Sequence, residues 1–195
     1  MEKGGLSAAL AGAGVAQGKA VGWADEMRLG LLGRVRRVWG IRGIQIRQKV
    51  ECTYQWRYLS LAVDGVGGQL WWSWSPNLKK ETVQAVVREW QEAGIGALVW
   101  DRAPSHRAKV VKAVGLPLIE QPPAAPELNP AERVFEELRR AVEGRVYGTI
   151  EKKMAAVERV LQELAASPER VQRLTGWPWI RVSLAQLPQK LAAFS

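Results

Sequence analysis

The sequence predicts an α/β protein whose mixed central sheet carries helices on both faces. Two observations lead to this expectation. Short apolar segments bounded by Gly, Pro and Asp come first along the chain, and segments with helical spacing of apolar residues then alternate with further short apolar segments. Strands followed by a helix–strand–helix–strand–helix order are typical of a sheet that is covered on both sides. With 195 residues, 47% of them hydrophobic, the chain is long enough for one substantial core.

The first part of the chain is expected to supply the strands that pair locally. Residues 20–33 and 36–43 have strand-like patterns. Residues 56–63 and 68–76 are joined by the sequence DGVGG, and because Asp-Gly and Gly-Gly fit tight turns, these two segments are expected to form a hairpin. Residues 1–20, which are small and rich in Gly and Ala, predict a flexible N-terminal leader.

The rest of the chain is expected to alternate between helices and strands. Residues 80–94 have apolar side chains at helical spacing and end at a glycine, which predicts a helix. Residues 168–195 form a C-terminal extension that the pattern leaves unplaced, so the expected domain spans residues 21–167. Its remaining elements are a buried strand at 95–100, a helix at 105–115, a strand at 116–123, a helix opened by the NPAE of residues 129–132, and an amphipathic helix at 149–167.

The charge of the chain points to an anionic partner. Its 28 Lys and Arg exceed its 19 Asp and Glu by nine, and residues 1–60 alone carry 10 Lys and Arg against 4 acids. A basic excess of this size usually indicates binding to nucleic acid. The alternative is a basic surface that only keeps the protein in solution. No run of 18 apolar residues occurs, so no membrane partner is expected. The single cysteine, Cys52, excludes an internal disulfide and fits a cytoplasmic location.

Aspartate is rare in this chain, with three residues against sixteen glutamates. Asp64 opens the expected hairpin turn, a common place for Asp. Asp25 interrupts an apolar strand, where it either faces water on an alternating strand or serves a site. Asp101 directly follows the strand expected at 95–100, and ligands bind at the carboxyl ends of strands in open α/β sheets. The alternative for Asp101 is a turn or helix-capping aspartate.

Glu132 lies in the first turn of the helix that opens at Asn129. With Asn129 as the N-cap and Pro130 at the first helical position, Glu132 takes the third position, which is the capping-box arrangement with Asn in place of Ser or Thr. Glu132 also borders the apolar arc that begins with Ala131 and Val134. A carboxylate at this border can face the strand ends, so capping and a functional role are both compatible with the pattern.

Asp25, Asp101 and Glu132 are therefore candidate metal ligands. Three carboxylates that meet at one point repel one another unless cations lie between them, and hard oxygen ligands suit Mg²⁺ or Mn²⁺. Two such ions, about 4 Å apart, can activate a water or a 3′-hydroxyl and stabilise the leaving oxygen of a phosphodiester. A basic surface that holds DNA beside an acidic pocket that holds metal is a coherent combination.

Three blocks of the sequence resemble the catalytic blocks of DDE transposases, most closely the mariner-like insertion sequence 630 family. The resemblance implies a ribonuclease H-like fold in which Asp25, Asp101 and Glu132 bind two divalent ions. It also implies cleavage at transposon ends and joining of the 3′-ends to target DNA. His106 matches a histidine of the family, and both a DNA-contacting role and an exposed position at a helix start are open for it. The blocks are WADEMRLGLLGRVRRVWGIRG, ALVWDRAPSH and PPAAPELNPAERVFEELRR, which cover roughly residues 20–145.

Other features of the resemblance concern partners. Arg102, which stands where the family commonly has Asn, is expected to contact DNA together with Arg107 and Asn129. About 20 residues precede the first catalytic strand, so the chain is expected to lack the family's N-terminal helix-turn-helix domains and to act with a separately encoded DNA-recognition domain. A homodimer is a further expected assembly. The alternatives are another ribonuclease H-like nuclease, such as a junction resolvase or a ribonuclease H, and an inactive DNA-binding remnant of a transposase.

Overall fold

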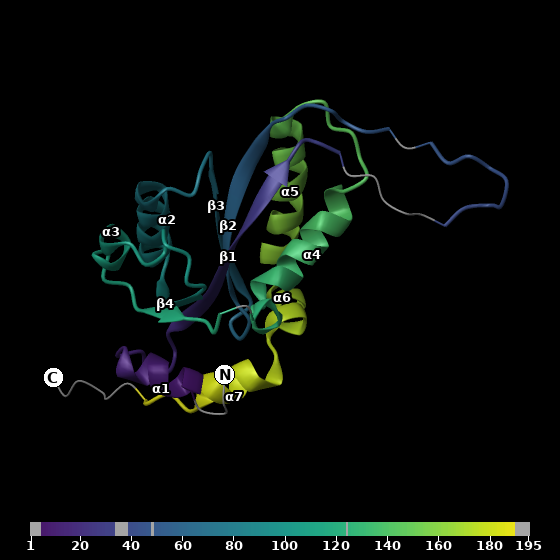
Figure 1. Ribbon diagram of the computed structural model, residues 1–195. Coiled ribbons are helices and arrows are strands. Elements are labelled where there is room, and N and C mark those ends of the chain that lie inside the picture. The colour runs from purple at the N-terminus through teal and green to yellow at the C-terminus, as the bar shows by residue number, and fades with distance from the viewer. Residues whose placement is uncertain (1–4, 34–38, 48, 124, 190–195) are drawn as a thin grey trace.

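A five-stranded mixed sheet forms the centre of the molecule (Figure 1). The computed structural model describes residues 5–33, 39–47, 49–123 and 125–189. The strand order is β3-β2-β1-β4-β5, in which β1 pairs antiparallel with β2 and parallel with β4. The predicted mixed sheet is therefore confirmed. The strands are β1 (Ala20–Gly30), β2 (Trp56–Asp64), β3 (Gln69–Ser75), β4 (Ile95–Trp100) and β5 (Leu118–Glu120).

Helices cover both faces of the sheet, as the sequence predicts (Figure 1). On one face, α2 (Lys80–Glu92) and the short α3 (Lys109–Lys112) pack against the sheet through Trp90 and Val111. On the other face lie α4 (Ala131–Val142), α5 (Ile150–Ala165) and α6 (Pro168–Thr175). The apolar arc predicted for α4 is buried there. Its residues Ala131, Val134, Phe135 and Leu138 share one core cluster with Val157 and Leu161 of α5 and with Trp23 and Leu61 of the sheet.

The hairpin of β2 and β3 forms as predicted, and Asp64 stabilises its turn. The Asp64 carboxylate accepts hydrogen bonds from the backbone N–H groups of Val66 (2.8 Å) and Gly67 (2.9 Å), which is the structural role expected for it. The turn lies against the C-terminal end of α6, because a Cβ added at Gly65 would come within 2.5 Å of the Thr175 carbonyl oxygen.

Substitution of Gly65 by Ala is expected to destabilise the protein by about 1–3 kcal/mol, because the added methyl group would force the hairpin turn away from α6. The measurement is the free energy of unfolding in urea. Gly12→Ala is the matched control, since a Cβ at Gly12 would meet nothing within 4 Å. Equal stabilities of the two variants would contradict this packing of the turn.

The connection between β1 and β2 differs from the sequence-based expectation. Residues 39–43 of the strand predicted at 36–43 have no strand structure, and residues 36–38 lie outside the described residues. The described part of the connection extends away from the sheet (Figure 1). It exposes large apolar side chains, including Trp39 (102%) and Ile41 (75%), and its described residues have no strand pairing.

The two ends of the described chain pack together, where the sequence predicted a flexible leader and an unplaced extension. Residues 5–12 form α1 (Gly5–Gly12), which lies beside α7 (Pro178–Ala185) (Figure 1). Leu6 and Leu10 are buried, and the Gln17 side chain donates a hydrogen bond to the Ala185 carbonyl oxygen (2.8 Å). The leader prediction is therefore wrong for residues 5–12, because α7 supplies apolar surface that a Gly- and Ala-rich segment alone does not reveal.

Two predicted elements are shorter than expected. The helix predicted at 105–115 is reduced to the four residues of α3, and the strand predicted at 116–123 is reduced to β5. The chain before α3 forms turns instead, and these turns carry His106 into the protein interior. No helix in the described ranges has both the length and the apolar character needed to cross a bilayer.

Candidate active site

The strand register places Asp25 and Asp101 next to each other. In the parallel pair of β1 and β4, Trp23 is opposite Val99, and each aspartate follows two residues later on its own chain. Neighbouring strands lie about 4.8 Å apart, so the two positions share one level of the sheet at the carboxyl end of β4. Asp101 therefore lies at the sheet edge where the sequence analysis placed it, and its side chain is 57% exposed.

Asp25 faces the α4 side of the sheet rather than open water. Side chains alternate along β1, and Trp23 and Met27, on either side of Asp25 in the same row, belong to the core cluster that contains Phe135 of α4. Ala24 belongs to the cluster on the opposite face. Of the two alternatives left open by the sequence, the alternating strand with Asp25 directed to solvent is therefore wrong.

Asn129 connects the start of α4 to Asp25. Its Oδ1 accepts a hydrogen bond from the Ala131 N–H (3.1 Å), which is a helix cap, and its Nδ2 donates to the Ala24 carbonyl oxygen (3.1 Å) and to Asp25 Oδ2 (3.2 Å). Asn129 is 3% exposed. The structure thus corrects the expectation that Asn129 contacts DNA, because both ends of its amide are occupied inside the protein.

Glu132 is not used in a capping box. The Asn129 N–H that such a box would offer donates instead to the Pro126 carbonyl oxygen (2.9 Å). The Glu132 carboxylate lies 3.3 Å from the Arg139 guanidinium and is partly exposed. Because the cap forms through Asn129 alone, the carboxylate of Glu132 is available for another role at the same end of the sheet.

Negative charges are concentrated around Asp25. The pKa of Asp25 is raised to about 7, mainly by burial and also by the charges of Glu26, Glu132 and Asp101, and a hydrogen bond from the Glu26 N–H partly opposes this rise. Glu132 and Asp101 therefore lie near enough to Asp25 for their charges to disfavour its ionisation. Their mutual repulsion is the situation that a bound cation would relieve.

His106 bridges two acids inside the protein. Its Nδ1 lies 2.6 Å from Asp101 Oδ1, its Nε2 lies 3.2 Å from Glu26 Oε1, and its ring stacks on Trp100 with centroids 3.8 Å apart. Burial lowers the pKa of His106, but Glu26 and Asp101 together raise it above its usual value. His106 is only 5% exposed, so neither an exposed helix start nor a DNA contact describes it. Its geometry is that of a residue that orients Asp101.

Substitution of His106 by Phe is expected to lower divalent metal affinity and metal-dependent activity about 10–100-fold, because Asp101 would lose the group that orients it. Phe keeps a ring against Trp100, so the stacking is largely retained. The measurement is the Mn²⁺ concentration needed for half-maximal DNA nicking, with circular dichroism to confirm folding. An unchanged Mn²⁺ requirement would assign His106 a packing role only.

Arg102 and Arg107, the other two expected DNA contacts, both lie at the surface near this site. Each pairs with Glu120 of β5 at 3.2 Å, and their side chains are 49% and 56% exposed. One carboxylate shared by two guanidinium groups leaves a net positive surface beside Asp101. A DNA contact by these two arginines stays a prediction.

Sequence reasoning did not assign a role to Glu26 or Arg139. Glu26 stands next to Asp25 within the first block, and its side chain is 9% exposed, with Oε1 buried and 3.2 Å from His106 Nε2. The adjacent Asp-Glu pair was therefore the available signal. Arg139 reaches Glu132 from two turns further along α4, and no feature of the sequence indicates that pairing.

The donor set fits a hard divalent cation by its chemistry. Three carboxylates supply anionic oxygens, the ligands that Mg²⁺ and Mn²⁺ prefer, and the raised pKa of Asp25 reflects its burial and the negative charges around it. Among the described residues, no three His, Cys, Asp or Glu side chains are gathered into a ready metal cage. The Asp101 carboxylate contacts His106, and the Glu132 carboxylate contacts Arg139. The Asp101 side chain is 57% exposed and the Glu132 side chain is 35% exposed.

The fold is similar to that of solved Mos1 transposase complexes. The mariner Mos1 paired-end complex with Mg matches with a TM-score of 0.62 and 18% identity over 86% of this chain. The Mos1 paired-end complex with Mn matches with a TM-score of 0.60 and 13% identity over 86% of this chain. The chain spans about half of those proteins, 54% in both cases. These matches confirm the predicted ribonuclease H-like fold. No curated protein sequence matches the chain.

The family follows from the sequence as a whole. The family model described as DDE superfamily endonuclease matches residues 20–152, which is more than half of the chain. The matched region runs from the first residue of β1 into α5 and contains Asp25, Asp101 and Glu132. With the arrangement of the strands and of these three acids, the match shows that the chain belongs to the DDE superfamily endonucleases.

Proposed function

We propose that the protein is the catalytic domain of a transposase that cleaves DNA at transposon ends and joins the 3′-ends to target DNA. The observation that carries this proposal is the placement of Asp25 and Asp101 at one level of two neighbouring parallel strands, with the start of α4, which carries Glu132, joined to Asp25 through Asn129. The Mos1 structures are described as complexes with a transposon end and as a strand transfer complex, which supports the same substrate here.

In this proposal the three carboxylates bind two Mg²⁺ or Mn²⁺ ions. Bound ions supply activation of a water or 3′-hydroxyl nucleophile and stabilisation of the leaving oxygen. Asp25 is the most buried of the three acids and is fixed by Asn129 and by the Glu26 N–H, so it would hold its position without the ions. Asp101 is oriented by His106, and Glu132 would exchange its contact with Arg139 for metal coordination.

The proposed partners are DNA, a second copy of the chain and a separately encoded DNA-recognition domain. The basic excess of nine charges supports DNA, and a DNA substrate implies a cytoplasmic location with the nucleoid. Exposed apolar side chains on the connection between β1 and β2, such as Ile41 and Ile44, support a protein partner such as the second copy.

Nicking of supercoiled plasmid DNA tests the proposal. The purified protein is expected to nick the plasmid with Mn²⁺ or Mg²⁺ and to be inactive with EDTA. Parallel reactions with an RNA–DNA hybrid and a four-way junction distinguish the alternatives, because preferential cleavage of either would indicate a ribonuclease H or a resolvase. DNA binding without cleavage of any substrate, and without metal binding in calorimetry, would indicate an inactive remnant.

A further inference from the structure

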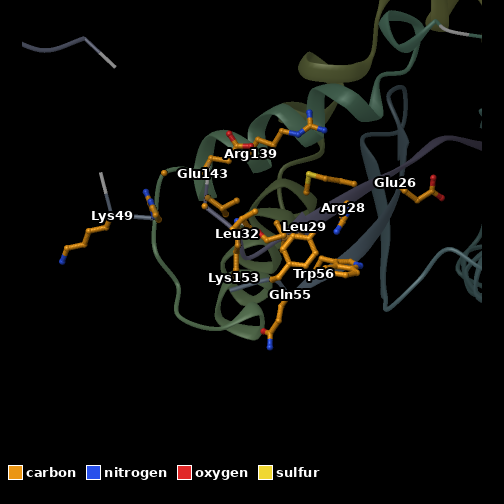
Figure 2. Close-up of a pocket in the computed structure, with 17 residues that line it drawn as sticks. Glu26, Arg28, Leu29, Leu32, Lys49, Gln55, Trp56, Arg139, Glu143 and Lys153 are labelled. Carbon is orange, nitrogen blue, oxygen red and sulfur yellow. The ribbon is translucent and has the colours of Figure 1, made fainter. Parts of the chain in front are cut away.

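A cavity of about 490 Å³ lies beside β1, and Glu26 and Arg139 are among the residues that line it (Figure 2). It is bounded by the last part of β1, the end of α4 and residues 54–56 at the start of β2. Two of its lining residues belong also to the carboxylate cluster, since Glu26 follows Asp25 and contacts His106, and Arg139 pairs with Glu132. A polymer chain that leaves the carboxylates along β1 would therefore enter this cavity.

The lining of the cavity favours an anion. Its charged residues comprise five bases and two acids, the acids being Glu26 and Glu143. The bases come from four different parts of the chain, so positive charge surrounds the space rather than lying on one wall. A volume of this size is in the usual range of about 300–1,000 Å³ for ligand sites. The bases are Arg28, Lys49, Arg139, Arg145 and Lys153.

Aromatic side chains form one wall of the cavity. Tyr54 and Trp56 meet edge to face, with ring centroids 5.2 Å apart, and the guanidinium of Arg28 lies 4.3 Å from the Trp56 ring centroid. The Tyr54 side chain is 69% exposed although it is aromatic, so little of its surface is used in packing. Aromatic rings beside basic groups are the arrangement on which bases of single-stranded nucleic acid stack.

We propose that this cavity binds an unpaired nucleotide of the DNA strand next to the phosphodiester that the carboxylates act on. The base stacks on the Tyr54 and Trp56 wall, and the adjoining phosphate pairs with Arg28 and Arg145. A base within a duplex is stacked on its neighbours and has no free face for the aromatic wall, so the cavity selects single-stranded over double-stranded DNA. This inference rests on the proposed function for the identity of the polymer, but it concerns binding and needs neither metal nor cleavage.

Fluorescence anisotropy with a labelled oligothymidylate and a labelled duplex of equal length, both in EDTA, tests the proposal. Tyr54→Ala is expected to weaken oligothymidylate binding about 5–100-fold, since stacking on one aromatic ring contributes roughly 1–3 kcal/mol per base, and to change duplex binding less than about twofold. Tyr54→Phe keeps the ring and is expected to restore the affinity. Because Tyr54 is largely exposed, its loss does not endanger folding.

Arg145→Glu provides an independent variant on the same cavity. It is expected to weaken oligothymidylate binding. It should also reduce the slope of log affinity against log salt concentration by about one, the change expected for the loss of one phosphate contact. Arg88→Glu, an exposed site on α2 across the sheet, is the matched control for net charge. Equal losses in Arg145→Glu and Arg88→Glu, or equal losses of single-stranded and duplex binding in Tyr54→Ala, would overturn the cavity assignment. Selective single-stranded binding without nicking would instead leave the cavity standing and refute the proposed enzymatic function.

Discussion

Replacement of Asp101 by Asn, or of Glu132 by Gln, is expected to lower Mn²⁺-dependent nicking about 10³-fold or more, a loss of roughly 4 kcal/mol in transition-state stabilisation. Each change removes one anionic oxygen ligand and leaves the shape of the side chain unchanged. Both proteins are expected to stay folded, because the Asp101 side chain is 57% exposed and that of Glu132 is 35% exposed. The Glu132–Arg139 pair that is lost is partly exposed and contributes about 0–1 kcal/mol.

The control for these variants lies on the same helix. Glu136→Gln makes the same chemical change one turn after Glu132 on α4, at a residue that is paired with Arg133 on the surface. It is expected to nick DNA as the unchanged protein does, and thermal unfolding of all three variants would report on the fold. Nicking that survives in Asp101→Asn or in Glu132→Gln would remove that residue from the catalytic set.

Replacement of Asp25 by Asn is expected to stabilise the metal-free protein by about 1–3 kcal/mol above pH 7. The folded pKa of Asp25, about 7, lies above its ordinary value of 3.8, so ionisation of this carboxyl is disfavoured in the folded state. Stability of the unchanged protein therefore falls as pH rises from about 4 to about 7, and the amide avoids this loss. The whole pKa shift, from 3.8 to about 7, corresponds to a larger stabilisation than this. The amide of Asn offsets part of it, because it has one acceptor oxygen fewer and loses a hydrogen bond, either from Asn129 or from the Glu26 N–H.

Urea unfolding between pH 4 and pH 9 would measure this effect. In EDTA, the difference between the variant and the unchanged protein is expected to grow with pH and to approach a constant value above pH 7. Saturating Mn²⁺ is expected to reverse the order, because an ion bound at 100 times its dissociation constant stabilises the folded protein by about 2.7 kcal/mol and the variant lacks one ligand. A difference that is independent of pH, or unaffected by Mn²⁺, would contradict the assignment of Asp25 to a metal site.

The parts of the fold that were predicted correctly are those with a strong local signal. The apolar segment of β1, the helical spacing in α2 and α4, and the DGVGG turn each indicate their structure within a few residues. The helices α6 and α7 begin with Pro168 and Pro178, a common first helical residue, but each is only eight residues long and too short for a clear period. The helix α1 depends on distant packing and gave no local signal.

The candidate site likewise combines residues that have a local sequence signal with contacts that depend on packing between distant parts of the chain. Asp25 and Asp101 stood out because aspartate is unusual within or directly after an apolar strand, and Glu132 because it borders the apolar arc of its helix. The contact of His106 with Glu26 and the link from Asn129 to Asp25 join residues that are remote in sequence and belong to different parts of the fold. Such contacts depend on how the elements pack, so spacing along the chain could not predict them.

The meeting of α1 and α7 has a consequence for biosynthesis. Ser7 donates a hydrogen bond to Gln186, 179 residues later in the chain, so α1 cannot reach its buried position until residue 186 has left the ribosome. During translation Leu6 and Leu10 lack the surface that covers them in the finished protein. The nascent chain therefore exposes the apolar side of α1 to solvent until α7 has been synthesised.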